Sequence, residues 1–358
     1  MSSKIRIKKN LKNFTAYEPD EIDYLFRLNA NESPFDETKT ILARLSKTKN
    51  RNYLKTNSVN RYPDPSQNQL RKKVSKLHGI NQNQIIFGNG SDELILYLLL
   101  VLTGKSSTII HLEPSFSMYK ILSLATGNKA IKVNLDKNFQ INIRDMIIKI
   151  KKNNPDLIFI PTPNNPTGNS FKHDDIKEII KQSRGIVVID EAYADYSSYS
   201  YLPMLKRNKN LLIMKTMSKV GFASLRLGYL IGNSKIISEI NKIRLPYNIS
   251  TLSQLIACDY FDNQKTMKKK IEIIKRERSR LVKFLNEKTN FQVYPTDSNF
   301  VLIKTIQSKS LNNFLKTKSI ILRSFNSNEK LKNCLRITIG LPKENNKLIR
   351  AISSFMAK

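Results

Sequence analysis

Runs of apolar residues alternate with more polar stretches between residues 67 and 232. The runs are rich in Ile, Val, Leu and Phe, which is typical of strands buried on both faces of a sheet. Strands are expected at 85–87, 108–112, 157–160, 186–189, 211–214 and 227–231, and helices at about 67–77, 94–102, 143–152 and 174–182, with one more ending near Leu124. This alternation predicts an α/β fold with a mainly parallel sheet covered by helices.

The pattern changes after Gly232. A helix is expected at 236–244, a break at 245–248, and one long charged helical stretch from 251 to about 285. Short strands follow at 291–293, 299–303, 320–323 and 334–339, with helices between them and a last helix at 345–355. This second pattern predicts a smaller α+β domain.

The chain of 358 residues is long enough for two domains. We expect an N-terminal arm at residues 1–35, a large domain at 36–245 and a small domain at 246–358. The long helix at about 251–285 bridges the two domains in this interpretation.

Composition indicates a soluble globular protein, with 40% apolar residues. The longest apolar run, Leu94 to Leu102, is far too short to span a bilayer and is interpreted as a buried helix. The basic N-terminus is not followed by the apolar core of a signal peptide. The two cysteines, Cys258 and Cys334, lie far apart and form no metal-ligand pair. We therefore expect a cytoplasmic protein without a metal.

The formal net charge of +32 invites a nucleic-acid or membrane interpretation. The basic residues are nevertheless spread along the whole chain, with short runs at 8–12, 71–76 and 268–280 and no aromatic-interleaved tract. This distribution favours a solvated basic surface over a specific nucleic-acid or membrane partner. A phosphorylated small substrate would also be attracted by such a field.

Lys219 is a lone lysine between two segments that both look buried, 211–214 and 227–231. A desolvated lysine is costly unless it loses its charge, and such a lysine is the usual source of an imine-forming amine. An ordinary solvated loop lysine is the alternative, and this stretch alone favours it.

Polar turns follow several of the predicted strands, at the edge of the sheet where ligands bind in parallel α/β proteins. They contain Gly90-Ser91-Asp92, Phe116, Asn165, Asp190-Glu191-Ala192-Tyr193 and Lys219. Ser91 and Asp92 stand at the start of a helix, where free backbone N–H groups suit a phosphate. A plain helix cap is an equally good interpretation of that turn.

Three motifs resemble the pyridoxal-phosphate (PLP) dependent aminotransferases of fold type I, class I/II. They are Asn165-Pro166-Thr167-Gly168, Asp190-Glu191-Ala192-Tyr193, and Ser218-Lys219 followed by Arg226-Leu227-Gly228. More narrowly, the stretches 28–35, 60–65, 88–93 and 335–340 resemble the histidinol-phosphate aminotransferases. The resemblance covers nearly the whole chain and implies a large domain with a mainly parallel seven-stranded sheet, plus a smaller α+β domain.

The resemblance implies a role for each matched residue around the cofactor ring. Lys219 would hold PLP as an imine and then act as general base and acid. Asp190 would keep the pyridine nitrogen protonated, and Phe116 would stack on the ring. Asn165 and Tyr193 would donate hydrogen bonds to the phenolate oxygen.

The same resemblance implies the phosphate ligands and the oligomeric state. Backbone groups of Ser91 and Asp92, with Ser218 and Arg226, would hold the cofactor phosphate. Tyr62 would reach this phosphate from a second subunit, which implies a homodimer with shared active sites. The spacing from Lys219 to Arg226 is one residue shorter than in many class I/II enzymes.

Substrate binding is implied for four positions, one of which, Asn165, is also a cofactor residue. Arg336 matches the arginine that grips the substrate carboxylate. Arg323 and Tyr17 match positions that hold the substrate phosphate, with surface filler as the alternative for both.

We therefore expect transamination between glutamate and imidazole-acetol phosphate, which gives histidinol phosphate and 2-oxoglutarate in L-histidine biosynthesis. A phosphothreonine or phosphoserine decarboxylase, or another aminotransferase of the same fold, is the alternative within the family. A non-catalytic polyanion-binding protein is a remote alternative, which would leave Lys219 and Asp190 as unexplained buried charges.

Overall fold

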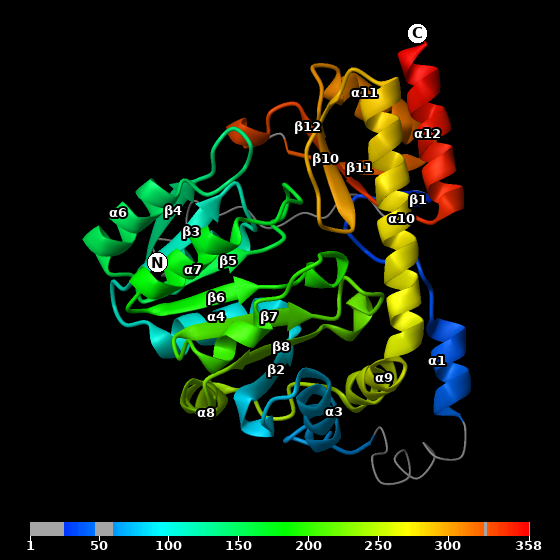
Figure 1. Ribbon diagram of the computed structural model, residues 1–358. Coiled ribbons are helices and arrows are strands. Elements are labelled where there is room, and N and C mark those ends of the chain that lie inside the picture. The colour runs from blue at the N-terminus through cyan, green and yellow to red at the C-terminus, as the bar shows by residue number, and fades with distance from the viewer. Residues whose placement is uncertain (1–24, 47–59, 326–327, 358) are drawn as a thin grey trace, which may run out of the picture.

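The computed structural model describes residues 25–46, 60–325 and 328–357. Two β-sheets, each with its own helices, organise these residues (Figure 1). The long helix α10 runs along one side of the molecule and joins the region of the first sheet to that of the second.

The first sheet has seven strands in the order β2-β8-β7-β6-β5-β3-β4. Strand β8 is antiparallel to both of its neighbours, and the other strands run parallel to one another. The strands are β2 (Ile85–Asn89), β3 (Thr108–Glu113), β4 (Lys129–Asn134), β5 (Leu157–Pro161), β6 (Ile186–Asp190), β7 (Leu211–Thr216) and β8 (Leu227–Gly232). The predicted fold, a mainly parallel seven-stranded sheet, is confirmed.

Helices cover both faces of this sheet. On one face pack α6 (Ile143–Asn153) and α7 (His173–Gln182). On the other pack α4 (Gly90–Leu102), α5 (Met118–Ala125) and α8 (Ser234–Ile243). Because both faces are covered, strands β5 and β7 are buried at every position, which agrees with the nearly continuous apolar runs seen in the sequence.

Helix α6 shows how local sequence sets these boundaries. The Asn142 side chain accepts a hydrogen bond from the backbone N–H of Asp145, which caps the first turn. Met146 and Ile150 lie four residues apart and are buried against the sheet. Asn154 then ends the helix in a left-handed conformation with φ of 39°.

Strand β4 was missed by the sequence prediction. Its sequence, Lys129 to Asn134, is charged at two positions, and most of its side chains are partly or fully exposed. It lies at the edge of the sheet, where β3 is its only neighbouring strand among the described residues. The apolar run that marks a central strand is therefore absent from it.

The second sheet has the order β1-β11-β12-β10-β9. Its strands are β1 (Phe26–Leu28), β9 (Gln292–Val293), β10 (Phe300–Lys304), β11 (Ile320–Ser324) and β12 (Cys334–Thr338). Helices α10 (Gln264–Lys288), α11 (Ser308–Thr317) and α12 (Pro342–Met356) share its core. The remaining helices described are α1 (Thr38–Leu45), α3 (Asn68–His78) and α9 (Thr251–Asp262).

One expectation about this part of the chain is wrong. The helix expected at about 251–285 is two helices that meet at Asn263. The first, α9, packs on α3 beside the first sheet, and α10 leads to the second. Phe26 to Leu28, which belong to the expected N-terminal arm, pair in parallel with β11. The division of the chain at residue 245 stays a prediction.

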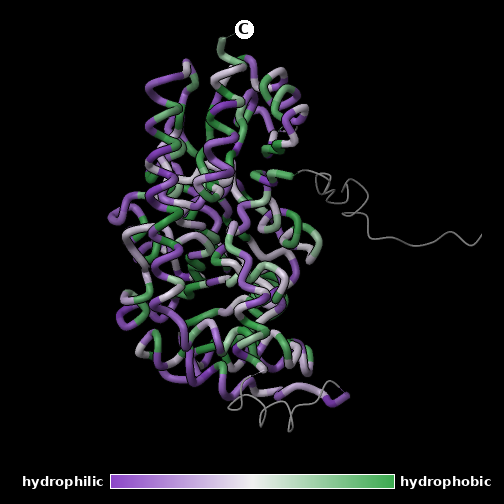
Figure 2. Tube along the Cα trace, turned by 90° about the vertical axis from the view of Figure 1, so that its right-hand side faces the viewer, coloured by the Kyte–Doolittle hydropathy of each residue, from purple (hydrophilic) through white to green (hydrophobic). Residues whose placement is uncertain are grey.

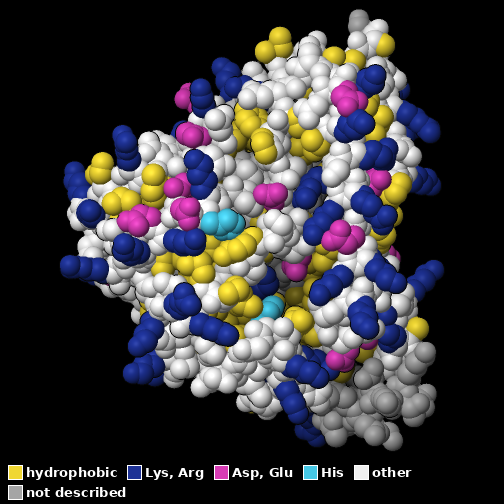
Figure 3. Space-filling view, viewed as in Figure 1, with side chains coloured by type: hydrophobic (Ala, Val, Ile, Leu, Met, Phe, Trp, Pro, Cys, Tyr) yellow, Lys and Arg dark blue, Asp and Glu magenta, His cyan; other side chains and the backbone are white. Residues whose placement is uncertain are grey.

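Polar and apolar residues alternate along the helices of the second sheet, as purple and green turns show in Figure 2. On the face seen in Figure 3, lysine and arginine side chains are spread widely and not gathered in one patch. No helix among the described residues combines the length and the apolar character needed to cross a membrane.

Candidate active site

A cavity lies at the carboxyl ends of strands β5, β6 and β7 and at the start of α4. Nine of the ten residues expected to bind the cofactor line it: Ser91, Asp92, Phe116, Asn165, Asp190, Tyr193, Ser218, Lys219 and Arg226. The parallel strands bring these residues together because their carboxyl ends share one edge of the sheet. Tyr62 is the exception.

One end of the cavity is formed by the first turn of α4 and by Arg226. Gly90 has φ of 76°, and a methyl group there would lie 2.7 Å from Nη2 of Arg226. Gly228 of β8 is also required, because a methyl group on it would lie 2.8 Å from the amide nitrogen of Ser91. The helix start therefore exposes its amides in a space that only glycine leaves open, as an anion site needs.

Arg226 lines this end in spite of its short spacing from Lys219. It adopts a left-handed conformation with φ of 46° directly after the short 3₁₀ helix Ala223–Leu225. Its Nη2 donates to Oδ2 of Asp92 at 3.0 Å, and both side chains are about half exposed. The other carboxylate oxygen of Asp92, Oδ1, is buried and has no hydrogen-bond partner among the described residues.

Asp190, the last residue of β6, also lines the cavity. Its carboxylate accepts a hydrogen bond from the Tyr119 hydroxyl at 2.6 Å and one from the Ala192 backbone N–H at 2.9 Å. Burial raises the pKa of Asp190 to about 6, although both hydrogen bonds act to lower it. No cation is paired with this carboxylate among the described residues. Asp190 therefore suits a cationic ligand group.

Asn165 and Tyr193 line the same cavity. The Tyr193 hydroxyl accepts a hydrogen bond from Nδ2 of Asn31 at 3.0 Å. Asn31 is itself buried, and Asn299 and Thr338 of the second sheet region hold its backbone. The turn at 28–35 thus fixes the orientation of Tyr193 from across the two parts of the molecule.

Lys219 lies in the tight turn that follows β7. Its Nζ lies 5.9 Å from the centre of the Tyr193 ring, on the cavity side. Its backbone carbonyl accepts a hydrogen bond from the Tyr196 hydroxyl at 2.6 Å. Lys219 forms no ion pair with an acid among the described residues.

Of the predicted substrate residues, Asn165 lines the cavity, whereas Arg336 and Arg323 do not. Arg336 of β12 donates to Oδ1 of Asn165 at 2.5 Å and to the carbonyl oxygen of Asn29 at 2.6 Å. Arg323 of β11 is the strand partner of Arg336 and is half-buried. Tyr17 lies outside the described residues.

Tyr62 does not reach the cavity of its own chain. Its side chain is 78% exposed, and its ring stacks on Tyr247 with the centres 4.4 Å apart. The cavity of one chain is therefore lined without Tyr62.

Three residues that hold the site in place are not predicted from the sequence: Tyr119, Asn31 and Tyr196. Their partners lie 71, 162 and 23 residues away in sequence, so no local spacing reveals the contacts. A sequence signal exists only for Asn31, which lies in the stretch 28–35 that resembles the histidinol-phosphate aminotransferases.

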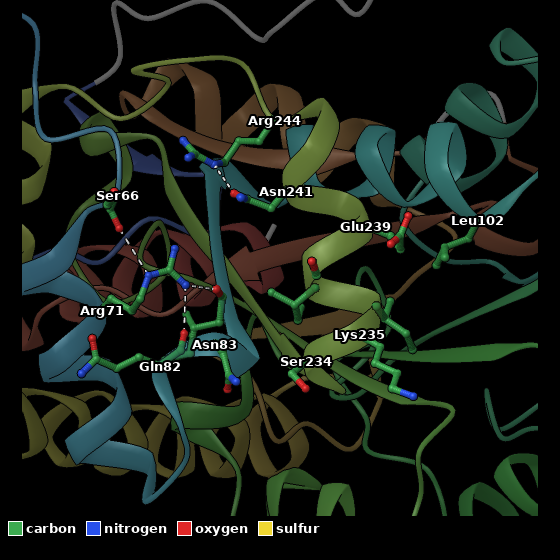
Figure 4. A pocket seen from close by; sticks show the side chains of 14 residues that line it. Ser66, Arg71, Gln82, Asn83, Leu102, Ser234, Lys235, Glu239, Asn241 and Arg244 are labelled. Carbon is green, nitrogen blue, oxygen red and sulfur yellow. Dashed lines mark hydrogen bonds between the residues drawn. The ribbon is translucent and has the colours of Figure 1, made fainter.

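A larger cavity of about 900 Å³ lies elsewhere, between α3, α8 and the start of β2 (Figure 4). Arg71 there donates to the backbone carbonyls of Gln82, in a short 3₁₀ helix, and of Ile85, on the edge strand β2. Arg244 donates to Asn241 and to the carbonyl of Pro65. Because both guanidinium groups are bound to the chain's own oxygens, they stabilise the sheet edge and the adjoining loop.

The fold and the smaller cavity define a class of protein: a two-sheet α/β protein with a lysine and an aspartate on neighbouring strand ends and an arginine beside a helix start. The family comparison is more specific. Residues 24–352 match the family model for aminotransferase class I and II. The chain belongs to this family, whose cofactor is PLP, and the resemblance seen in the sequence is confirmed.

The relatives are similar over nearly their full length. A histidinol-phosphate aminotransferase of Caldanaerobacter subterraneus is 34% identical over 98% of this chain and 99% of its own. The crystal structure of the enzyme of that name from Clostridium acetobutylicum is 25% identical, with a TM-score of 0.83 over 93% of this chain and 99% of its own. The Sinorhizobium meliloti structure, a complex with pyridoxal-5'-phosphate, shares the fold at 18% identity, with a TM-score of 0.87 over 99% of both chains.

Proposed function

We propose that the protein is a histidinol-phosphate aminotransferase. It exchanges the amino group between glutamate and imidazole-acetol phosphate, giving 2-oxoglutarate and histidinol phosphate in L-histidine biosynthesis. The observation that supports this proposal most directly is that Lys219, Asp190 and Arg226 line one cavity. Arg336 donates a hydrogen bond to Asn165, which lines the same cavity. The full-length similarity to relatives of that name supports the choice of substrate.

The cavity fits PLP in its charge pattern. The anion site at the start of α4 and at Arg226 suits the cofactor phosphate. Asp190, buried without a cationic partner among the described residues, suits the protonated ring nitrogen. Phe116 lines the same wall, where it can stack on the ring. When bound, PLP supplies an aldehyde for attachment and a ring that withdraws electrons from the substrate.

The chain's own residues then have distinct tasks. The Nζ of Lys219 attaches the cofactor and, once released by substrate, carries a proton as general base and acid. Asp190 holds a proton on the ring nitrogen. Asn165 and Tyr193 donate hydrogen bonds to the phenolate oxygen, while Asn31 keeps the Tyr193 hydroxyl in place.

Arg336 is suited to the substrate carboxylate because its guanidinium is already held by Asn165 and by the Asn29 carbonyl. A fixed planar fork loses less entropy when it binds a carboxylate. Arg323, on the adjacent strand, and Tyr17 would bind the phosphate of histidinol phosphate.

We also propose a cytoplasmic homodimer with shared active sites. The support is Tyr62, which is exposed, lies outside its own cavity and stacks on Tyr247. An exposed stacked pair of tyrosines is typical of a protein interface. One chain has a mass of 41.3 kDa, and sedimentation should give twice this value. Tyr62→Phe should weaken cofactor binding. A monomer that is fully active would contradict the proposal.

Single-turnover assays test the substrate. The cofactor absorbance of the purified protein is followed after addition of histidinol phosphate, glutamate, phosphoserine or phenylalanine. Rapid bleaching by histidinol phosphate and glutamate is expected. Bleaching by phenylalanine but not by histidinol phosphate, or release of carbon dioxide from phosphoserine or phosphothreonine, would overturn the assignment.

A further inference from the structure

Tyr196 connects the turn that carries Lys219 to the core of the second sheet. It ends the short 3₁₀ helix Ala194–Tyr196, six residues after Asp190, and its side chain is 2% exposed. Its ring packs in the same apolar core as Ile274 and Leu281 of α10. Its hydroxyl donates to the backbone carbonyl of Lys219 at 2.6 Å.

A second hydrogen bond fixes Tyr196 from the other side. Nη1 of Arg278, on α10, donates to the backbone carbonyl of Tyr196 at 3.2 Å. The same nitrogen donates to the carbonyl of Ser298, just before β10, at 2.8 Å. The backbone of Lys219 is thus joined through Tyr196 and Arg278 to the elements that carry the second sheet.

The backbone position of a reactive lysine matters because its side chain has four rotatable bonds. If Cα is fixed, Nζ can reach the reacting carbon in few conformations, and the productive one is more populated. The N–H groups of Val220 and Phe222 hold the turn by donating to the Met217 carbonyl. Among the described residues, the carbonyl of Lys219 itself accepts a hydrogen bond only from the Tyr196 hydroxyl, which therefore fixes the lysine's own peptide group.

We propose that Tyr196 is a positioning residue for Lys219, which acts by holding the lysine's backbone carbonyl and not by touching substrate. This inference rests on the proposed role of Lys219. It predicts that loss of the hydroxyl slows covalent attachment of the cofactor while leaving the phosphate and ring-nitrogen sites intact. A purely structural role would weaken all of these properties together.

The test compares Tyr196→Phe with Tyr201→Phe. Tyr201 is equally buried, at 3% exposure, but its hydroxyl has no hydrogen-bond partner among the described residues. Both changes therefore remove one buried hydroxyl, and only one removes a contact with Lys219. Arg278→Met is a third variant, which leaves the hydroxyl and removes the support of Tyr196 from α10.

Two measurements are made on each cofactor-free variant after thermal unfolding has shown that it is folded. The first is the rate at which PLP attaches: Nζ condenses with the aldehyde to form a C=N bond and release water, and borohydride traps the product. The second is the affinity for pyridoxamine phosphate, which has the same phosphate and ring but no aldehyde and cannot attach.

Tyr196→Phe should slow attachment about tenfold, corresponding to one lost hydrogen bond of about 1.4 kcal/mol, with pyridoxamine phosphate affinity within about twofold of wild type. Arg278→Met should slow attachment by a smaller factor, and Tyr201→Phe should match wild type. Equal attachment in both tyrosine variants, or equal loss of both properties in Tyr196→Phe, would overturn the inference. Wild-type protein that forms no trapped product would overturn the role of Lys219 itself.

Discussion

Two sets of one acid and one lysine lie at the ends of strands β6 and β7, and only one set forms an ion pair. Glu191 and Lys215 form a buried ion pair at 2.8 Å, and Glu191 also accepts hydrogen bonds from Ser200 and from the Tyr201 N–H. Asp190 and Lys219, on the same strand ends, line the cavity without pairing with each other. Asp190 and Glu191 are adjacent in sequence, so their side chains leave the strand on opposite sides.

The difference separates structure from function. The Glu191 pair is complete: burial alone would lower the pKa of Lys215, but attraction to Glu191 and Asp195 more than compensates and raises it. Asp190 has hydrogen bonds but no cation, and burial raises its pKa to about 6. Glu191 and Lys215 neutralise each other and need no further partner. Asp190 is a buried carboxylate without a cationic partner among the described residues, so it can serve as a binding site for a charged group.

The largest effect is expected for the functional lysine. Lys219→Ala should lower the turnover rate by at least about a thousandfold, because the nucleophile and the proton carrier are lost together. It should also abolish the absorbance at about 420 nm that is typical of a lysine-bound cofactor. Stability should be nearly unchanged, and a coloured, active variant would contradict the assignment.

The structural pair should respond in the opposite way. Glu191→Gln should lower the free energy of unfolding by roughly 3–5 kcal/mol, because Lys215 is left as a buried uncompensated charge. Glu191→Leu combined with Lys215→Met should recover most of this loss. Urea unfolding measures both variants. An unchanged free energy of unfolding in Glu191→Gln would show that the ion pair between Glu191 and Lys215 does not stabilise the fold.

Stability of the cofactor-free protein should fall as the pH rises from 4 to 6. The folded state binds a proton on Asp190 more tightly than the unfolded state does, because the pKa is raised from 3.8 to about 6. This contribution is therefore present at pH 4 and lost above pH 6, and amounts to about 3 kcal/mol. Asp190→Asn should lack this component, so the difference between the two pH profiles of unfolding isolates it. Parallel profiles would contradict the raised pKa.

The smallest effect is expected for Tyr119→Phe. The Tyr119 hydroxyl lowers the pKa of Asp190 through its hydrogen bond, so its removal should raise that pKa further. Pyridoxamine phosphate should then bind about fivefold more weakly near neutral pH, a loss of about 1 kcal/mol. Calorimetric titration against Tyr201→Phe as control measures the change, and identical affinities would remove Tyr119 from the site.

The residues that line the cavity could be predicted from the sequence better than the residues that hold them in place. Asp190, Asn165 and Lys219 could be placed together because each follows a strand whose apolar run is unmistakable, and parallel strands end at one edge. Tyr119 and Asn31 could not be found, because their hydrogen bonds depend on how distant segments pack. The break at Asn263 was hidden because α9 and α10 are both of helical sequence on either side of it.

The most direct test of this account is to locate the covalent bond between the chain and its cofactor. Purified protein is reduced with borohydride, digested and analysed by mass spectrometry. The account predicts one modified residue, Lys219, with Lys215 unmodified although it lies only four positions earlier on the same strand and turn. Attachment at Lys215, or no attachment at all, would contradict it.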